Sequence, residues 1–292
     1  MVCIIQLANT GTERASLASA DFRRLEFLHE QVWAKKDALP DGVFRNFEFP
    51  MFKNKTDTDT DTDTNPPERR EIWTAEKLSL LHISNEPTLQ GIGRLPCRAD
   101  ELLVRESYRE MYDILVTDQE DRIRTVHAGR MIPDWKKFSL ILGQPGIGKR
   151  WFLSYVLVRR LLEGKPTIFQ AGICGSDAAE PTAATHYLIN ANGVHPMRDS
   201  PSISVLTDPE IWFLADHHPV GAAVQASHNW LVVVTSSTRK RNNHYLIKNW
   251  SPRKYYLPVR EWEEIVAAAK SYLPVSPQAL FSRLNWLPQF IC

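Results

Sequence analysis

The sequence predicts an α/β fold in which a parallel sheet is flanked by helices. Beyond about residue 115, short apolar runs typical of buried strands alternate with stretches of helical periodicity. The clearest strand, residues 138–142, is followed at once by a glycine-rich segment and then by a long apolar helix. Strand, glycine loop and helix in this order are typical of a βα unit in a parallel sheet.

The composition narrows the class of protein. The 292 residues have a formal net charge of +1, with 43% hydrophobic and 24% charged residues. Such a near-neutral balance does not indicate nucleic acid or an acidic membrane surface as the main partner. The four cysteines stand singly, without the spacing of a zinc site. Because no apolar run approaches the roughly 20 residues that span a bilayer, we expect an intracellular protein, cytoplasmic or nuclear.

The N-terminal segment, residues 1–55, is poorly patterned apart from one amphipathic helix. This helix is predicted from Asp21 to about Trp33 because apolar residues recur along one stripe. The stripe consists of Phe22, Leu25, Leu28 and Val32. Around this helix the sequence is weakly patterned.

Residues 56–67 alternate threonine and aspartate and end in two prolines. This composition is unable to bury apolar area, so it predicts a flexible linker that proteases would cut first. A calcium site is the alternative, because four carboxylates recur at a spacing of two. These are Asp57, Asp59, Asp61 and Asp63. The run lacks the central glycine and the last glutamate of an EF-hand loop, which favours the linker.

A lead-in, residues 68–95, connects the linker to the main domain, residues 96–275. Within the lead-in a short helix is predicted from Thr74, as N-cap, through Leu78 and Leu81. A longer helix is predicted at about residues 99–115, where apolar side chains recur at helical spacing. Residues 276–292 are expected to form a short C-terminal tail.

The glycine-rich segment fits the phosphate-binding pattern G-x-x-x-x-G-K. Its members are Gly143, Gln144, Pro145, Gly146, Ile147, Gly148 and Lys149. Glycines allow backbone N–H groups to approach phosphate oxygens, and the lysine places a positive charge on the terminal phosphates. A glycine-rich turn that binds nothing is the alternative. We expect a nucleoside triphosphate, ATP in the first place, to contact this loop together with Arg150 and Trp151.

The helix after the loop strengthens this prediction. It is apolar almost all round, and Gly164 and Pro166 end it. Its N-terminus points at the loop and adds its dipole to anion binding. The predicted fold is therefore a P-loop NTPase of three layers. One position departs from the pattern, because Arg150 replaces the serine or threonine that binds Mg²⁺.

In a P-loop NTPase, a carboxylate at the end of another strand holds Mg²⁺ through water. We predict a core strand over residues 203–208, so that Asp208 is this acid. An ordinary acid before a turn is the alternative, since Pro209 follows. Many NTPases with an extra strand between the two motifs use a glutamate beside the aspartate as base. Glu210 is the nearest candidate for that base.

Three further segments are predicted as strands. Residues 167–170 follow the loop helix, and residues 187–194 suggest a hairpin because Asn192 and Gly193 favour a type I′ turn. Residues 230–234 form an apolar strand that ends in hydroxyl side chains. Thr235 and Ser236 are candidate sensors of the γ-phosphate, or they satisfy the backbone of a turn. A last amphipathic helix is predicted over residues 261–272.

Several segments together resemble a known family. They are VRESYREMY, GQPGIGKR, LVRRLLEGKPTIFQ, NWLVVVTSS and YYLPVREWEEIVAAA. Over roughly residues 95–275 they are similar to the NTPase module of Crinkler and retrotransposon-hot-spot-like (RHS-like) proteins. The resemblance implies an ASCE-type P-loop fold related to AAA and STAND ATPases, with Lys149 on phosphate and Asp208 as the Walker B acid. Family members commonly join this module to a nuclease-like or other effector domain.

Two functions follow as expectations. The first is a nucleotide-binding module, at most a weak ATPase because of Arg150, whose nucleotide state regulates an unidentified protein partner. The second is a nonenzymatic interaction or effector remnant on a degenerate P-loop scaffold, because Arg150 and Pro209 depart from the family pattern and the tail is short. Phosphate release with and without Mg²⁺ separates them.

Overall fold

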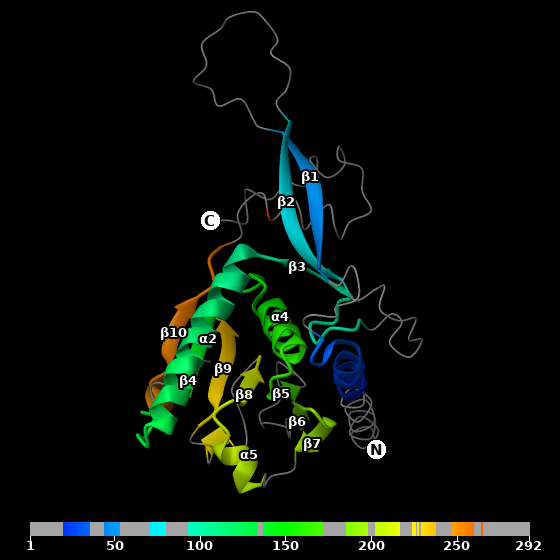
Figure 1. Cartoon of the computed structure of the whole chain (residues 1–292). Helices are drawn as coiled ribbons and strands as arrows, with labels where there is room; N and C mark the ends of the chain where they lie inside the picture. The colour runs from blue at the N-terminus through cyan, green and yellow to red at the C-terminus, as the bar shows by residue number, and fades with distance from the viewer. Residues whose placement is uncertain are drawn as a thin grey trace, which may run out of the picture.

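The computed structural model of the chain contains two sheets with helices packed beside them (Figure 1). The residues that the structure describes are 20–35, 44–52, 70–79, 93–133, 137–171, 185–197, 202–216, 224–225, 227, 229–237, 247–259 and 264. The predicted linker at residues 56–67 and the predicted tail at residues 276–292 lie outside them. So does the predicted helix at residues 261–272, except for Glu264.

The larger sheet has seven strands in the order β10-β4-β9-β8-β5-β6-β7. The strands are β4 Phe138–Gly143, β5 Thr167–Ala171, β6 Thr185–Asn190, β7 Gly193–Met197, β8 Trp212–Ala215, β9 Leu231–Ser237 and β10 Arg253–Tyr256. Neighbours from β10 to β5 run parallel, whereas β6 and β7 form an antiparallel hairpin at one edge. The expectation of an α/β fold with a mainly parallel sheet is confirmed, and the strands predicted at residues 138–142, 167–170 and 230–234 are present.

The central strands are buried on both faces. Successive side chains alternate between two hydrophobic clusters, as the period of two in a strand requires. In β8, Trp212 and Leu214 belong to the first cluster, and Phe213 and Ala215 belong to the second. Strands buried on both faces read as continuous apolar runs, and this explains why β4 and β9 could be predicted from sequence.

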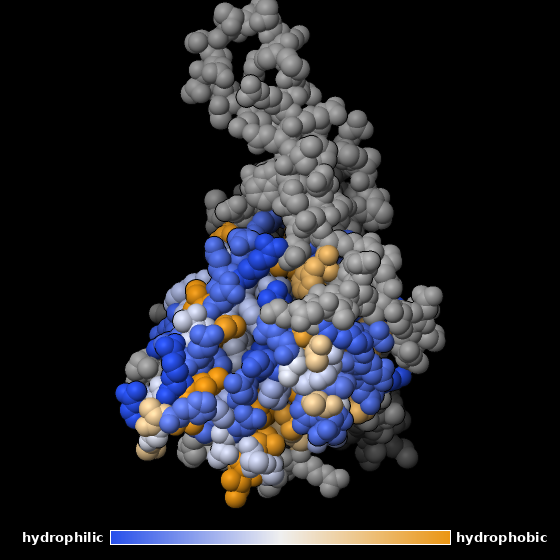
Figure 2. All heavy atoms as spheres, viewed as in Figure 1, coloured by the Kyte–Doolittle hydropathy of each residue, from blue (hydrophilic) through white to orange (hydrophobic). Residues whose placement is uncertain are grey.

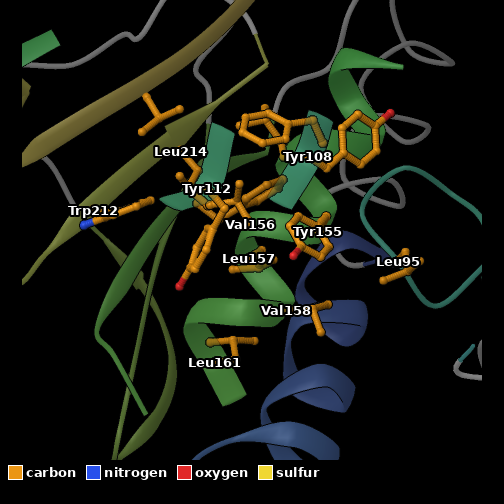
Figure 3. Close-up of a cluster of buried hydrophobic side chains, with 14 of the residues drawn as sticks. Leu95, Tyr108, Tyr112, Tyr155, Val156, Leu157, Val158, Leu161, Trp212 and Leu214 are labelled. Atoms are coloured by element: carbon orange, nitrogen blue, oxygen red, sulfur yellow. The ribbon is translucent and has the colours of Figure 1, made fainter. Parts of the chain in front are cut away.

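The first cluster lies under the helices. Figures 1 and 3 show α2 (Glu106–His127) and α4 (Lys149–Leu162) side by side over one face of the sheet, with Tyr108, Tyr112 and Tyr155 between them. Helix residues 20–32 also pack here, since Leu25, Phe27, Leu28 and Val32 are buried in the same cluster. The amphipathic helix predicted near residue 21 is therefore confirmed. The second cluster is covered by Val205, Leu206 and Trp250, which are partly buried.

The helix α4 ends where its sequence predicts. Gly164 has φ +64°, its N–H donates to the Leu161 carbonyl at 3.0 Å, and the Lys165 N–H donates to the Arg160 carbonyl at 3.0 Å. A left-handed residue of this kind terminates a helix while satisfying its last carbonyls, and glycine adopts it without a Cβ clash. The N-terminus of α4, with Lys149 as its first residue, lies at the opposite end of the helix.

The smaller sheet corrects two helix predictions. Its antiparallel strands are β1 Phe44–Phe52, β2 Arg70–Ser79 and β3 Glu101–Val104, and Figure 1 shows β1 and β2 extending away from the larger sheet. The segment from Thr74 to Leu78 is strand, not helix, because it pairs with β1 on one side and in part with β3 on the other. Strand pairing outweighs local helical spacing here. The helix predicted from residue 99 begins only at Glu106 and runs well past Leu115 to His127.

The hairpin predicted at residues 187–194 is present, but its turn differs. Asn190 pairs with Gly193, so Ala191 and Asn192 form the turn instead of Asn192 and Gly193. Gly193 has φ +117° and opens β7. Figure 2 shows hydrophilic residues over most of the visible described surface, with hydrophobic positions scattered among them. In the part of the chain that the structure describes, no helix has the length and apolar character needed to cross a membrane.

Candidate functional site

The glycine-rich loop lies at the carboxyl edge of the parallel strands. It connects the end of β4 to the start of α4, and in the register Leu142 and Gly143 of β4 lie opposite Ser236 and Ser237 of β9. In open α/β sheets, the loops at this edge form the crevice where ligands bind. The predicted loop and the predicted hydroxyl residues at the end of β9 therefore lie at the same edge.

Three glycines shape the loop, for two different reasons. Gly146 and Gly148 have φ +80° and φ +98°, in the left-handed region that residues with a Cβ rarely adopt. At Gly143 the reason is close approach, because a Cβ there would lie 2.9 Å from Cγ2 of Ile147. Ile147 is buried and anchors the loop on the first cluster, whereas Gln144, Pro145 and Gly146 are exposed.

Two side chains hold the loop by hydrogen bonds to its carbonyls: Tyr108 of α2, and Arg105, the residue before α2. The Tyr108 hydroxyl donates to the Gly148 carbonyl at 2.9 Å, and Arg105 Nη1 donates to the Ile147 carbonyl at 3.2 Å. Arg105 is itself buried and also pairs with Glu264 at 2.8 Å. These bonds draw loop carbonyls toward the protein, which favours amide N–H groups facing the opposite side. Neither Arg105 nor Tyr108 was identified as a site residue from sequence, although both belong to the segment VRESYREMY, because nothing local links that segment to the loop.

Lys149 lies over the loop that precedes it. Its Nζ donates to the carbonyls of Gly143 and Gln144, at 2.8 and 2.7 Å. Burial lowers the pKa of this ammonium, and the negative charge of Asp216 opposes that shift. The ammonium group thus contacts the loop carbonyls and is close enough to a carboxylate to be influenced by its charge.

Asp216 is that carboxylate, and it lies directly after β8. Its Oδ2 accepts a hydrogen bond from Arg150 Nε at 2.5 Å, and its Oδ1 accepts one from the Thr235 hydroxyl at 2.8 Å. Thr235 is fully buried in β9, the strand between β4 and β8. The structure therefore brings together Lys149, Arg150, Thr235 and Asp216, which come from three segments.

The predicted acid Asp208 and predicted base Glu210 lie apart from this group, and the core strand predicted over residues 203–208 is wrong. Residues Ile203–Thr207 form the short helix α5, not a core strand, and Asp208 follows it before β8 begins. Asp208 Oδ1 accepts from the Glu210 backbone N–H at 2.9 Å, as in an Asx turn, and the Glu210 carboxylate pairs with Lys165 at 2.9 Å. Arg160, near the C-terminus of α4, donates to the Glu210 carbonyl at 2.6 Å. At about 1.5 Å per residue, Arg160 lies roughly 16 Å along the helix from Lys149, so its partner Glu210 belongs to the opposite end of α4.

The error has a physical cause. A short apolar run with β-branched residues is compatible with either helix or strand, and in α5 only Val205 and Leu206 reach the second cluster while Ile203 is 78% exposed. The real strand is fully buried and reads Trp-Phe-Leu-Ala, followed by Asp216. An apolar run that ends directly in an acid was the signal that could have identified Asp216.

The remaining predicted residues divide between loop and core. Trp151 is partly buried and packs against the first cluster, one residue beyond Arg150. Ser236 follows Thr235 and lies opposite Leu142 in the register. Among the residues that the structure describes, no three His, Cys, Asp or Glu side chains form a group able to hold a metal ion.

Comparisons with known proteins give no further guidance on this site. No family model, curated protein or solved structure matched the chain.

Proposed function

We propose that this chain binds a nucleoside triphosphate, ATP in the first place, through the loop from Gly143 to Lys149. One observation supports the proposal most strongly: a glycine loop with left-handed Gly146 and Gly148 lies between a central buried strand and a helix N-terminus. Phosphate binding needs close backbone approach and N–H donors near the ligand, and a glycine loop at a helix N-terminus is suited to both.

The charges at the start of α4 support an anionic ligand. The first turn of this helix, which the structure describes in full, contains Lys149 and Arg150 and no acidic residue. A cation at a helix N-terminus is disfavoured by the dipole, by about 0.3–1 kcal/mol at an exposed site. Asp216 balances only one of these two adjacent cations, so phosphate groups would neutralise the positive charge that remains.

The strand order supports the same class of protein. Strand β9 lies between β4, which leads into the loop, and β8, which ends at Asp216. This is the extra strand expected between the two motifs of an ASCE-type NTPase. We therefore propose Asp216, in place of Asp208, as the acid of the second motif, and we retain the Crinkler and RHS-like NTPase module as the proposed type.

The same residues favour binding over hydrolysis. Hydrolysis in this class needs a base beside the acid, and the residue after Asp216 is His217 instead of glutamate. The hydroxyl expected after Lys149 is replaced by Arg150. We therefore propose a binding module whose nucleotide state regulates a protein partner, with turnover slow or absent. An interaction scaffold that binds no nucleotide is the second candidate, favoured by these same two replacements.

Calorimetric titration of the full chain with ATP separates the two candidates. We expect Lys149→Ala to weaken binding more than about tenfold, because it removes the charge nearest the terminal phosphates. Lys165→Ala is the matched control, since Lys165 pairs with Glu210 at the opposite end of α4. It should leave the affinity unchanged. Equal affinities for wild type and Lys149→Ala, or no binding by wild type, would refute the proposal.

A further inference from the structure

The residues that would bind Mg²⁺ in a P-loop NTPase contact each other in this chain. Elsewhere the metal is held by the hydroxyl that follows the loop lysine and by the acid of the second motif. Here the first position is Arg150, and its Nε lies 2.5 Å from Oδ2 of Asp216, the proposed acid. The second oxygen, Oδ1, accepts the hydroxyl of the buried Thr235.

This donor set does not fit Mg²⁺. The ion requires oxygen ligands in near-ideal octahedral geometry. A guanidinium has five N–H donors and no acceptor, and its charge is permanent, so it repels a cation and is unable to bind one. Both oxygens of Asp216 accept hydrogen bonds. A metal would therefore have to displace Arg150 from its carboxylate partner before it could approach Asp216.

Arg150 is nevertheless well placed to meet an anion. It belongs to the first turn of α4, directly after Lys149, and its side chain is 48% exposed. Asp216, with its side chain 23% exposed and fixed by Thr235, orients the guanidinium through Nε. Arginine forms planar, often bidentate, hydrogen bonds with phosphate oxygens. An arginine oriented in this way supplies positive charge at the loop without any metal.

We propose that the Arg150–Asp216 ion pair takes the place of the metal, so that the chain binds metal-free nucleoside triphosphate. Arg150 contacts the phosphates, and Asp216 and Thr235 are positioning residues that hold it. This inference rests on the proposed function, because it concerns the same loop. It adds the chemical form of the ligand: the free polyanion and not its magnesium complex.

The test is a pair of calorimetric ATP titrations of the full chain, one in excess Mg²⁺ and one in EDTA. We expect wild type to bind in EDTA at least as tightly as in Mg²⁺, because the uncomplexed triphosphate has more negative charge for Lys149 and Arg150. Strict dependence on Mg²⁺ would overturn the inference and leave the proposed function intact. Absence of binding in both titrations would overturn both. This comparison needs no variant, so it does not depend on a mutant folding.

Two variants sharpen the test. Arg150→Thr restores the hydroxyl and releases Asp216, so affinity in EDTA should fall about tenfold or more and Mg²⁺ should restore most of it. Arg159→Thr is the matched control, because Arg159 pairs with Glu163 at 3.6 Å near the other end of the same helix. It should bind like wild type in both titrations. An Arg150→Thr variant that melts like wild type and loses no affinity in EDTA would overturn the inference.

Discussion

The two ends of α4 both place arginine beside an acidic residue, but for different reasons. At the C-terminal end, Arg160 is 3% exposed, lies 4.5 Å from the centre of the Trp212 ring, and donates to the carbonyls of Pro166 and Glu210. Burial lowers the pKa of its guanidinium to about 10. At the N-terminal end, Arg150 is half exposed and contacts the carboxylate of Asp216.

The helix dipole separates these two cases. A cation near a helix C-terminus is favoured, and the fixed carbonyls around Arg160 satisfy it within the protein. A cation at the N-terminus is disfavoured, so Arg150 and Lys149 gain little for the fold from their position. Lys149 and Arg150 lie at the sheet edge where loops meet, and the fold gains little from their charge. Such charge favours a role in binding an anion. Charge that is itself buried and is satisfied by backbone carbonyls, as at Arg160, indicates a structural role.

The largest expected difference between the two ends is in stability. Arg160→Met should lower the free energy of unfolding by about 3 kcal/mol, because it leaves two partly buried carbonyls without their donor and removes the contact with the Trp212 ring. Arg150→Met should change it by less than about 1 kcal/mol, since half-exposed ion pairs contribute little. Urea unfolding followed by tryptophan fluorescence measures both. Equal losses for the two variants would mean that Arg150 is as structural as Arg160.

A second prediction concerns left-handed glycines inside and outside the loop. Gly146 (φ +80°) and Gly129 (φ +66°, after α2) both have open space where a Cβ would lie. Alanine at either position should therefore cost about 1 kcal/mol of stability from backbone strain alone. Only Gly146→Ala should weaken ATP binding, by about tenfold, because relieving the strain moves phosphate-facing amides. If Gly129→Ala weakens binding equally, the effect comes from general destabilisation.

The smallest expected effect comes from two tyrosine hydroxyls on α2. Tyr108 donates to the loop carbonyl of Gly148 at 2.9 Å, and Tyr112 donates to the Glu163 carboxylate at 3.0 Å, beyond the other end of α4. Phenylalanine at either position removes one hydrogen bond and should cost about 1 kcal/mol in urea unfolding. Calorimetry should detect a loss of ATP affinity, about threefold, only for Tyr108→Phe. The reverse pattern would show that α2 does not hold the loop for binding.

Local signals explain why part of the site could be predicted from the sequence. The strand ending at Gly143 is mainly apolar, the loop needs glycine at Gly146 and Gly148, and the helix ends at a left-handed Gly164. Each of these constraints acts within a few residues, so the order of residue types is enough to reveal it. The same holds for the replacement of a hydroxyl by Arg150, which is visible in the sequence without any structure.

Positions that depend on strand order could not be predicted in this way. Residues 203–208 and residues 211–216 are both apolar runs that lead to an acid, and the first was taken for the strand. The structure distinguishes the second, because Trp212–Ala215 pairs with β9 and β5 and is buried on both faces of the sheet. The strand β2 was not predicted for a similar reason. It is held by pairing with β1 and β3, and the sequence predicted neither of these strands.

The order of residues was enough to predict a βα unit with a glycine-rich loop that ends in a lysine and an arginine. Tertiary structure decided what that arginine contacts. Asp216 is 66 residues from Arg150 in the chain, and the two meet because β9 places β8 at a fixed distance from β4 along one sheet edge. A contact between residues so far apart in the chain depends on the order in which the strands pair. Backbone hydrogen bonds between strands are nearly the same for every residue type, so the local sequence does not reveal that order.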